Sequence, residues 1–266
     1  MLKPRIFTAL ILIPIVIAAV FFMPPLTFFS LALLVILLAG WEWSILAELP
    51  NLTLRIGFLV LLAAVLVLSV FVPLYVIISL AVVWWLIAIT LLAIYPRGKE
   101  RWGNSIWIRS LIGFLVLTPC WVGLIILQGF SPIVLMYCLI LIWGADTAAY
   151  FAGKKWGQHK LAPAISPGKT YEGFIGGLIA AAVIAGVGFW VLRIPSDRGL
   201  LFFIVSVIGG GLISVIGDLF ESMMKRQSHI KDSGSILPGH GGLLDRIDSM
   251  TTAIPFFALF FPYLFN

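Results

Sequence analysis

Residues 55–95 read RIGFLVLLAAVLVLSVFVPLYVIISLAVVWWLIAITLLAIY, and this stretch decides the fold class of the chain. Arg55 is its only charged side chain, and its only proline, Pro73, stands near the middle. A transmembrane helix needs roughly 20 mostly apolar residues, so one unbroken helix here would be about twice as long as the bilayer is thick. The stretch therefore predicts two membrane spans, 55–72 and 74–95, with a turn around Pro73.

Seven further runs of similar character surround this pair. The predicted spans are 6–23, 27–47, 55–72, 74–95, 108–127, 132–152, 173–192, 200–217 and 249–265. Composition agrees, because 62% of the 266 residues are hydrophobic and only 11% are charged, whereas a soluble domain carries about 25% charged residues. The sequence therefore predicts an all-α, polytopic integral membrane protein with about nine transmembrane helices in one domain, 1–266.

The first of these runs resembles a signal peptide, since Lys3 and Arg5 precede it. It is about long enough to span a bilayer, however, and Pro24 and Pro25 follow it in place of a small-x-small cleavage site. We therefore interpret it as an uncleaved span.

The basic residues give the orientation. With the N-terminus in the cytoplasm, all of the 17 Lys and Arg residues except Arg193 and Arg198 fall in cytoplasmic segments. This distribution satisfies the positive-inside rule. It also accounts for the net charge of +6 without a nucleic-acid partner.

The strongest chemical pattern runs from Gly217 to Asp248. If the eighth helix continues past Gly217, four polar side chains share one of its faces, at i, i+3, i+4 and i+7: Asp218, Glu221, Ser222 and Lys225. Asp245 and Asp248 are also three residues apart, where the ninth helix begins. Two carboxylate pairs at adjacent helix ends can converge on Mg²⁺, which prefers oxygen ligands. The alternative is that these acids only cap helices and pair with basic neighbours.

The same segment contains Lys231-Asp232 and the turn Pro238-Gly239-His240-Gly241-Gly242. Glycines let the backbone approach a ligand closely, and exposed backbone N–H groups bind phosphate. A histidine set among glycines in a charged loop favours a functional role for His240.

A second pattern, Ser166-Pro167-Gly168-Lys169-Thr170, precedes the seventh span. It is not a P-loop, because position 163 is proline where that motif needs glycine. A lysine beside a helix N-terminus indicates a phosphate site, and an ordinary helix cap with a solvated lysine is the alternative.

Asp146 lies within the sixth span, and an acid at that depth is usually functional. It could bind a metal or substrate, relay ions, or pair with a lysine such as Lys154.

These elements together resemble the phosphatidate cytidylyltransferase (CDP-diacylglycerol synthase) family, most closely its bacterial members. The stretch from Ser222 to Asp248 is similar to that family's signature in every element, and the Ser166–Thr170 and Asp146 segments and Trp41-Glu42-Trp43 are also similar. The resemblance covers essentially the whole chain.

The resemblance implies conversion of CTP and phosphatidate to CDP-diacylglycerol and diphosphate, with Mg²⁺, by a homodimer. It also implies a multi-pass protein of the bacterial cytoplasmic (inner) membrane whose site faces the cytoplasm. The two-metal centre of the family would fall on Asp218 and Asp245, with Asp248 as the alternative to Asp245. A second, monovalent ion is left open.

The predicted site comprises three groups. The predicted catalytic residues are Asp218, Asp245, Lys169 and His240. The predicted metal ligands are Asp218, Glu221, Asp245, Asp248 and Asp146. The predicted substrate-binding residues are Ser166, Lys169, Thr170, Ser222, Lys225, Arg226, Lys231, Asp232, Gly241, Gly242 and Arg246. Most lie in a predicted catalytic half, about 132–266, which follows the N-terminal spans of 1–95.

Two other functions would use similar residues. A CTP-dependent lipid kinase also needs metal and basic groups, but it would attack the γ-phosphate. An ion-coupled transporter could use Asp146 and Asp218 as a relay, although the matching halves typical of transporters are missing from the sequence.

Overall fold

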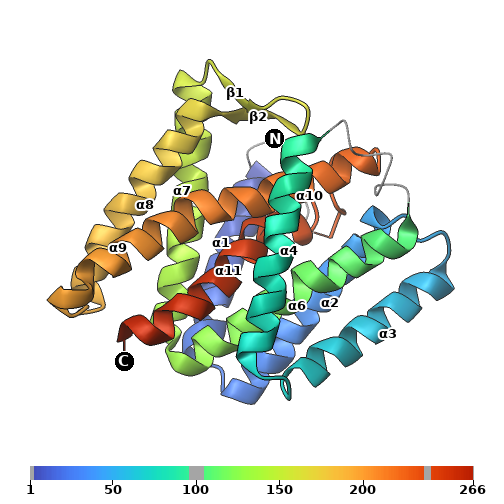
Figure 1. The fold of residues 1–266 in the computed structure, drawn as a ribbon, viewed down its shortest axis with the longest axis horizontal. Helices are drawn as coiled ribbons and strands as arrows, with labels where there is room; N and C mark the ends of the chain where they lie inside the picture. Colours follow the sequence, from blue (N-terminus) through green and yellow to red (C-terminus); the bar gives the residue numbers. More distant parts are fainter. Residues whose placement is uncertain (1–2, 96–104, 237–240, 266) are drawn as a thin grey trace.

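A computed structural model describes residues 3–95, 105–236 and 241–265, and Figure 1 shows a bundle of long helices. The helices are α1 (Lys3–Phe22), α2 (Pro25–Leu46), α3 (Leu52–Ser69), α4 (Leu74–Ile94), α6 (Ile106–Phe130), α7 (Pro132–Trp156), α8 (Tyr171–Val191), α9 (Gly199–Val207), α10 (Ser214–Gln227) and α11 (Leu244–Phe265). Within the described residues, eight helical stretches are long and apolar enough to cross a membrane, counting α9 to α10 as one. In α1 the part whose side chains are described, Leu12–Phe22, is apolar as well. The predicted class of about nine spans is confirmed.

The division around Pro73 is also confirmed. Helix α3 ends at Ser69, and Pro73 is the residue that precedes α4, with φ −55° and ψ 133°. Proline fixes φ and has no backbone N–H, so it is well tolerated at a helix start and disfavoured inside one. The chain therefore turns where the apolar run alone would have continued.

The eighth span is longer than predicted. It runs through α9, the π-helical segment η2 (Ile208–Ile213) and α10, and together with the preceding 3₁₀ turn η1 (Ser196–Arg198) it covers 32 residues. The polar residues after Gly217 extend the helix because the apolar face of α10 packs inward while Asp218 and Ser222 remain partly exposed. Residues Gly209, Gly210 and Gly211 of η2 are buried. A Cβ atom at Gly210 would lie 2.5 Å from Leu141, so the π turn lets neighbouring helices approach closely.

A short antiparallel hairpin lies between α7 and α8, formed by β1 (Lys160–Ala162) and β2 (Ser166–Thr170). The sequence analysis predicted no strand in this connection, and so small a hairpin leaves the all-α class unchanged. Pro163 and Pro167 disfavour a helix in this connection, and residues 163–165 form the turn between the strands.

The polar helix ends lie on one side of the bundle. In Figure 1 the hairpin and the start of the described chain lie toward the top, and the C-terminus lies at the lower left. Many large apolar side chains are exposed, such as Leu26, Phe71 and Trp190, as expected where lipid is the solvent. The buried core includes Trp43, Trp121, Phe220 and Phe257.

Candidate active site

The hairpin brings Lys169 to α10. Its Nζ lies 2.6 Å from Oδ2 of Asp218, and the Ser222 hydroxyl donates to Oδ1 of the same carboxylate at 3.3 Å. The next residue, Thr170, is buried and accepts a hydrogen bond from the Gly173 amide, so it caps α8. The two predicted polar patterns, about 50 residues apart in the chain, therefore meet at Asp218.

A second lysine joins α10 to α11. Nζ of Lys225 lies 2.6 Å from Oδ1 of Asp245 and 3.4 Å from Oε1 of Glu221. Oδ2 of Asp245 accepts the backbone N–H groups of Ser233 at 3.0 Å and Gly242 at 2.8 Å. Asp245 thus binds the backbone at Ser233 and at Gly242, and it holds both positions against the start of α11.

Three acids from three helices also lie near one another. Asp146 of α7, Asp218 of α10 and Asp248 of α11 are close enough to interact electrostatically. Lys154 does not pair with Asp146 among the described ion pairs, and its Nζ lies over the Tyr150 ring at 5.9 Å from the centroid. Lys154 is therefore not the partner of Asp146 here, and the lysine that interacts with Asp146 electrostatically is Lys169.

The cluster as a whole fits a divalent cation by charge and by donor type. Lys169 and Lys225 pair with three acids, Asp218, Glu221 and Asp245. Asp146 and Asp248 lie close enough to this group to interact with it electrostatically. Glu221 is 3% exposed, and Lys225 is its ion-pair partner, with Nζ at 3.4 Å from Oε1. Within the described chain neither carboxylate oxygen has a hydrogen-bond partner, so this buried charge is satisfied only in part, and its oxygens are suited to receive a cation. Within residues 3–95, 105–236 and 241–265, however, no three acidic, His or Cys side chains already converge as a metal site.

Gly217 allows α10 and α11 to meet beside this cluster. A Cβ atom here would lie 2.7 Å from the Thr252 hydroxyl and even closer to the Asp248 carbonyl oxygen. Thr252 in turn donates to the Ile213 carbonyl at 2.9 Å, which adds a polar link between the two helices. The absence of a side chain at 217 therefore sets how closely Asp218 and Asp248 approach.

Comparisons with known proteins identify the family of the chain. A model of the cytidylyltransferase family matches residues 3–264. The chain belongs to this family. A phosphatidate cytidylyltransferase of Pseudomonas aeruginosa is 43% identical over 97% of this chain and 96% of its own length. One from Haemophilus influenzae is 38% identical over 98% and 99% of the two chains, and one from Bacillus subtilis is 39% identical over 54% and 56%.

Family membership makes the chain a nucleotidyltransferase, as predicted, and decides against both the lipid kinase and the transporter. The other predicted substrate-binding residues of this cytidylyltransferase lie around the cluster. Nε of Arg226 donates to the Ile165 carbonyl at 3.1 Å and so holds the turn of the hairpin. Ser166 is partly buried in β2. Lys231, Asp232 and Arg246 are exposed.

The glycine turn is described only in part. Gly241 has φ +83°, a conformation that favours glycine, and a Cβ there would lie 2.8 Å from Oδ2 of Asp245. Gly242 is buried. The prediction for His240 lies outside the described residues.

Two buried charged residues, one on α2 and one on α6, are part of the structure around the site, and the sequence analysis gave neither a role there. Glu42 on α2 is 1% exposed, and its carboxylate accepts three hydrogen bonds from the segment before α11. Arg109 is 3% exposed and its NH1 lies 2.9 Å from Oε1 of Glu48. An acid inside an apolar helix, flanked by Trp41 and Trp43, was the signal that could have indicated Glu42.

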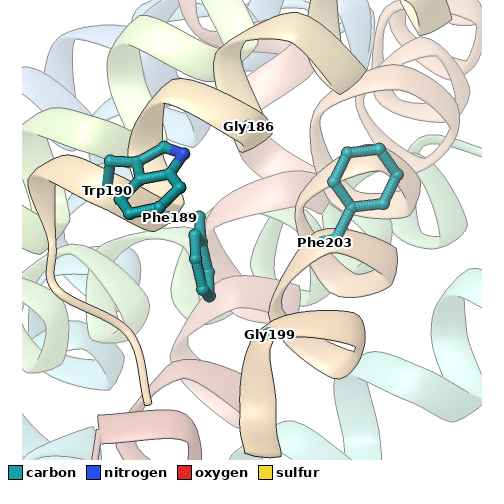
Figure 2. A pocket seen from close by; sticks show the side chains of 5 residues that line it. All are labelled: Gly186, Phe189, Trp190, Gly199 and Phe203. Atoms are coloured by element: carbon teal, nitrogen blue, oxygen red, sulfur yellow. The ribbon is translucent and has the colours of Figure 1, made fainter. Parts of the chain in front are cut away.

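A hollow elsewhere in the molecule does not share this chemistry. Figure 2 shows the aromatic side chains Phe189, Trp190 and Phe203 around it, together with Gly186 and Gly199. It lies between α8 and α9, toward the opposite end of α8 from strand β2, which carries Lys169. An apolar hollow of this kind is suited to lipid chains and offers no group for phosphate.

Proposed function

We propose that this chain catalyses the reaction of CTP with phosphatidate to give CDP-diacylglycerol and diphosphate, at the cluster between β2, α7, α10 and α11. The observation that carries the proposal is the pairing of Lys169 and Lys225 with acids of α10 and α11, in a chain that matches the cytidylyltransferase family along its whole length. The full-length relatives named phosphatidate cytidylyltransferase give the lipid substrate.

The chemistry needs positioning and charge neutralisation more than proton transfer. An oxygen of the lipid phosphate attacks the α-phosphorus of CTP, and the bond from that phosphorus to the diphosphate breaks. The attacking oxygen is already anionic at neutral pH, so no strong general base is required. The main barrier is the repulsion between two anions, which nearby cationic side chains reduce.

The basic residues have distinct parts in this proposal. Lys169 enters from the hairpin and Lys225 from α10, so their ammonium groups can hold phosphate oxygens from two directions. The remaining cationic side chains proposed to bind substrate phosphates are Arg226, Lys231 and Arg246. Ser166, Ser222 and the Gly241–Gly242 backbone are proposed as neutral donors, Thr170 as the cap that fixes Lys169, and Asp232 as a polar contact.

Mg²⁺ is the proposed cofactor, and a second, monovalent ion stays a proposal. Asp146, Asp218, Glu221, Asp245 and Asp248 supply the oxygen ligands that suit Mg²⁺. When bound, the ion would neutralise the triphosphate and stabilise the departing diphosphate. Asp245 already accepts two backbone N–H groups and Lys225, so Asp218 and Asp248 are the acids with more capacity for a cation.

The decisive test follows two labels of CTP. Label in the cytosine ring should enter the lipid fraction only when phosphatidate and Mg²⁺ are both present, because the CMP part is transferred. Label in the γ-phosphate should leave as diphosphate. If active protein moves the γ-phosphate label into lipid while the ring label stays in water, the reaction is a kinase reaction and the proposal is wrong.

We further propose that the site faces the cytoplasm in a bacterial inner membrane and that the enzyme is a homodimer. The support for sidedness is the positive-inside distribution of basic residues. The support for the dimer is the resemblance alone. CTP is a cytosolic nucleotide and phosphatidate a membrane lipid, so a site at the cytoplasmic ends of the helices gives both of them access.

Sidedness gives a second expected result. Ser235 is exposed in the connection between α10 and α11, and neither of the native cysteines, Cys120 and Cys138, is accessible. In the Ser235→Cys variant, a membrane-impermeant thiol reagent added to intact cells should leave the protein unlabelled, and the same reagent should label it after the membrane is opened. Rapid labelling in intact cells would place this connection outside and contradict the orientation.

A further inference from the structure

The carboxylate of Glu42 lies inside the bundle and contacts a segment about 200 positions away in the sequence. Its Oε2 accepts the Leu244 amide at 2.7 Å and the Ser233 hydroxyl at 3.0 Å, and its Oε1 accepts the Leu243 amide at 3.0 Å. No ion pair to Glu42 occurs among the described residues. The acid is therefore satisfied by donors of the α10–α11 connection (228–243) and the first residue of α11.

The chain around Glu42 is shaped to this carboxylate. A Cβ atom on Gly234 would contact Oε1, and a Cβ on Gly242 would lie 2.5 Å from Oε2. Two glycines thus let the backbone close around a single side chain. The unpaired N–H groups at a helix N-terminus favour a negative charge, and Glu42 supplies one at the start of α11.

The same segment is held from its other side by Asp245. Ser233 gives its hydroxyl to Glu42 and its amide to Asp245. Gly242 gives its amide to Asp245, while the next two amides go to Glu42. The two carboxylates therefore fix one stretch of backbone between them, and the place of Asp245 depends on that of Glu42.

The end of α2 also holds the beginning of the connection. The Leu46 carbonyl accepts the Ser228 hydroxyl at 2.6 Å and NH1 of Arg109 at 3.3 Å. Residues four apart on α2, 42 and 46, therefore anchor the described parts of the connection at both of its ends. Helix α2 serves as a fixed frame against which this polar segment is set.

We infer that Glu42 is a positioning residue of the transferase: its buried carboxylate fixes Ser233 and the start of α11, and so aligns Asp245 and Asp248 with Asp218 and the lysines. Glu42 does not touch the reacting atoms in this assignment. The expected effect on turnover rests on the proposed function. The placement of Ser233 and the start of α11 by Glu42 rests on the hydrogen bonds alone.

The first test is the Glu42→Gln variant, which keeps the size of the side chain. A glutamine has one acceptor oxygen and one NH₂ group, so it cannot accept from Leu243 and from the Leu244–Ser233 pair at the same time. We expect kcat to fall by about tenfold or more, with a smaller change in the KM for CTP. Glu42→Asp, which keeps the charge, should retain more of the turnover than Glu42→Gln. Turnover equal to that of the native protein in Glu42→Gln would overturn the inference.

A matched control uses an acid just beyond the end of α2. Glu48 pairs with Arg109, and its side chain is 46% exposed. Glu48→Gln removes a carboxylate close to the site without touching the α10–α11 connection, so its turnover should stay within about twofold of native. If Glu48→Gln loses as much turnover as Glu42→Gln, the loss is not specific to the contacts of Glu42. The assignment to Glu42 would then be wrong.

The second test remains informative if Glu42→Gln folds poorly. Ser233→Ala removes one donor to Glu42 and leaves the acid in place. Because the two groups contact each other, the effects of Ser233→Ala and Glu42→Gln on kcat should be non-additive in a double-mutant cycle. Strictly additive effects would contradict the contact on which the inference depends.

Hydrogen exchange separates this inference from the proposed function. The amides of Leu243 and Leu244 should exchange about tenfold faster in Glu42→Gln, while amides in the middle of α6 and α11 keep their native rates. This result is expected whether or not the protein transfers a cytidylyl group. If the native protein lacks the activity but these two amides still exchange faster in Glu42→Gln, only the proposed function fails. If their exchange is unchanged, the positioning role fails.

Discussion

Replacing Asp218 by Asn should lower cytidylyl transfer at least roughly a hundredfold while the protein stays folded. The carboxylate lies where the hairpin, α7, α10 and α11 meet, with Nζ of Lys169 at 2.6 Å and Asp146 and Asp248 nearby. Asparagine keeps the shape and loses the charge. The variant thus removes both a ligand for Mg²⁺ and the partner that holds Lys169.

The measurement is kcat with ring-labelled CTP, together with binding of Mn²⁺ in place of Mg²⁺, followed by electron paramagnetic resonance. Asp197→Asn is the matched control, because its carboxylate is 78% exposed and lies 4.0 Å from Arg198, away from the cluster. Asp218→Asn should weaken Mn²⁺ binding and Asp197→Asn should not. Near-native turnover in Asp218→Asn would remove this acid from the site, and lost turnover with unchanged Mn²⁺ binding would leave it a role toward Lys169 only.

Adding one methyl group at Gly217 should be nearly as damaging. In Gly217→Ala the new Cβ meets the Asp248 carbonyl oxygen, which is backbone of the facing helix, and the hydroxyl of the short Thr252 side chain. Helices α10 and α11 must then separate by several tenths of an ångström or more. Because catalysis depends on the mutual placement of charged groups, we expect a loss of turnover of about tenfold to a hundredfold.

The control for this prediction is another helical glycine. A Cβ at Gly57 of α3 meets nothing within 4 Å, so Gly57→Ala should leave turnover and thermal stability close to native or slightly improve stability. Gly217→Ala should also lower the unfolding temperature in detergent, since two helices lose close packing. Full activity and an unchanged unfolding temperature in Gly217→Ala would show that the two helices tolerate separation at this point.

Most of the fold was predictable because its pattern is local. An apolar run of 18 to 25 residues specifies a span wherever it occurs, so the turn at Pro73 and the order of the helices followed from the sequence. The boundaries were harder to predict. Helix α10 continues to Gln227, and α11 begins at Leu244, before the predicted 249. Both extensions are polar segments, and which of their side chains face inward is decided only by packing against the other helices.

The hairpin is another element that could not be predicted from local sequence. Ser166–Thr170 is too short and too polar for a periodicity argument, and its strand character depends on pairing with Lys160–Ala162. The sequence still indicated Lys169 as a phosphate-binding residue from its neighbours. Only the fold gave it Asp218 as a partner.

The sequence by itself determined that this chain is a membrane protein, and it predicted that most of its basic residues lie on one side. Its motifs also indicated a cytidylyltransferase, because a long pattern of charged and glycine residues can be recognised without coordinates. The tertiary structure decided which of these residues meet. Lys169 with Asp218, Lys225 with Asp245, and Glu42 with Ser233 and Leu244 are contacts between distant segments. The physical reason is that spans and motifs depend on neighbouring residues in the chain, whereas a buried carboxylate is satisfied by whichever donors helix packing brings to it.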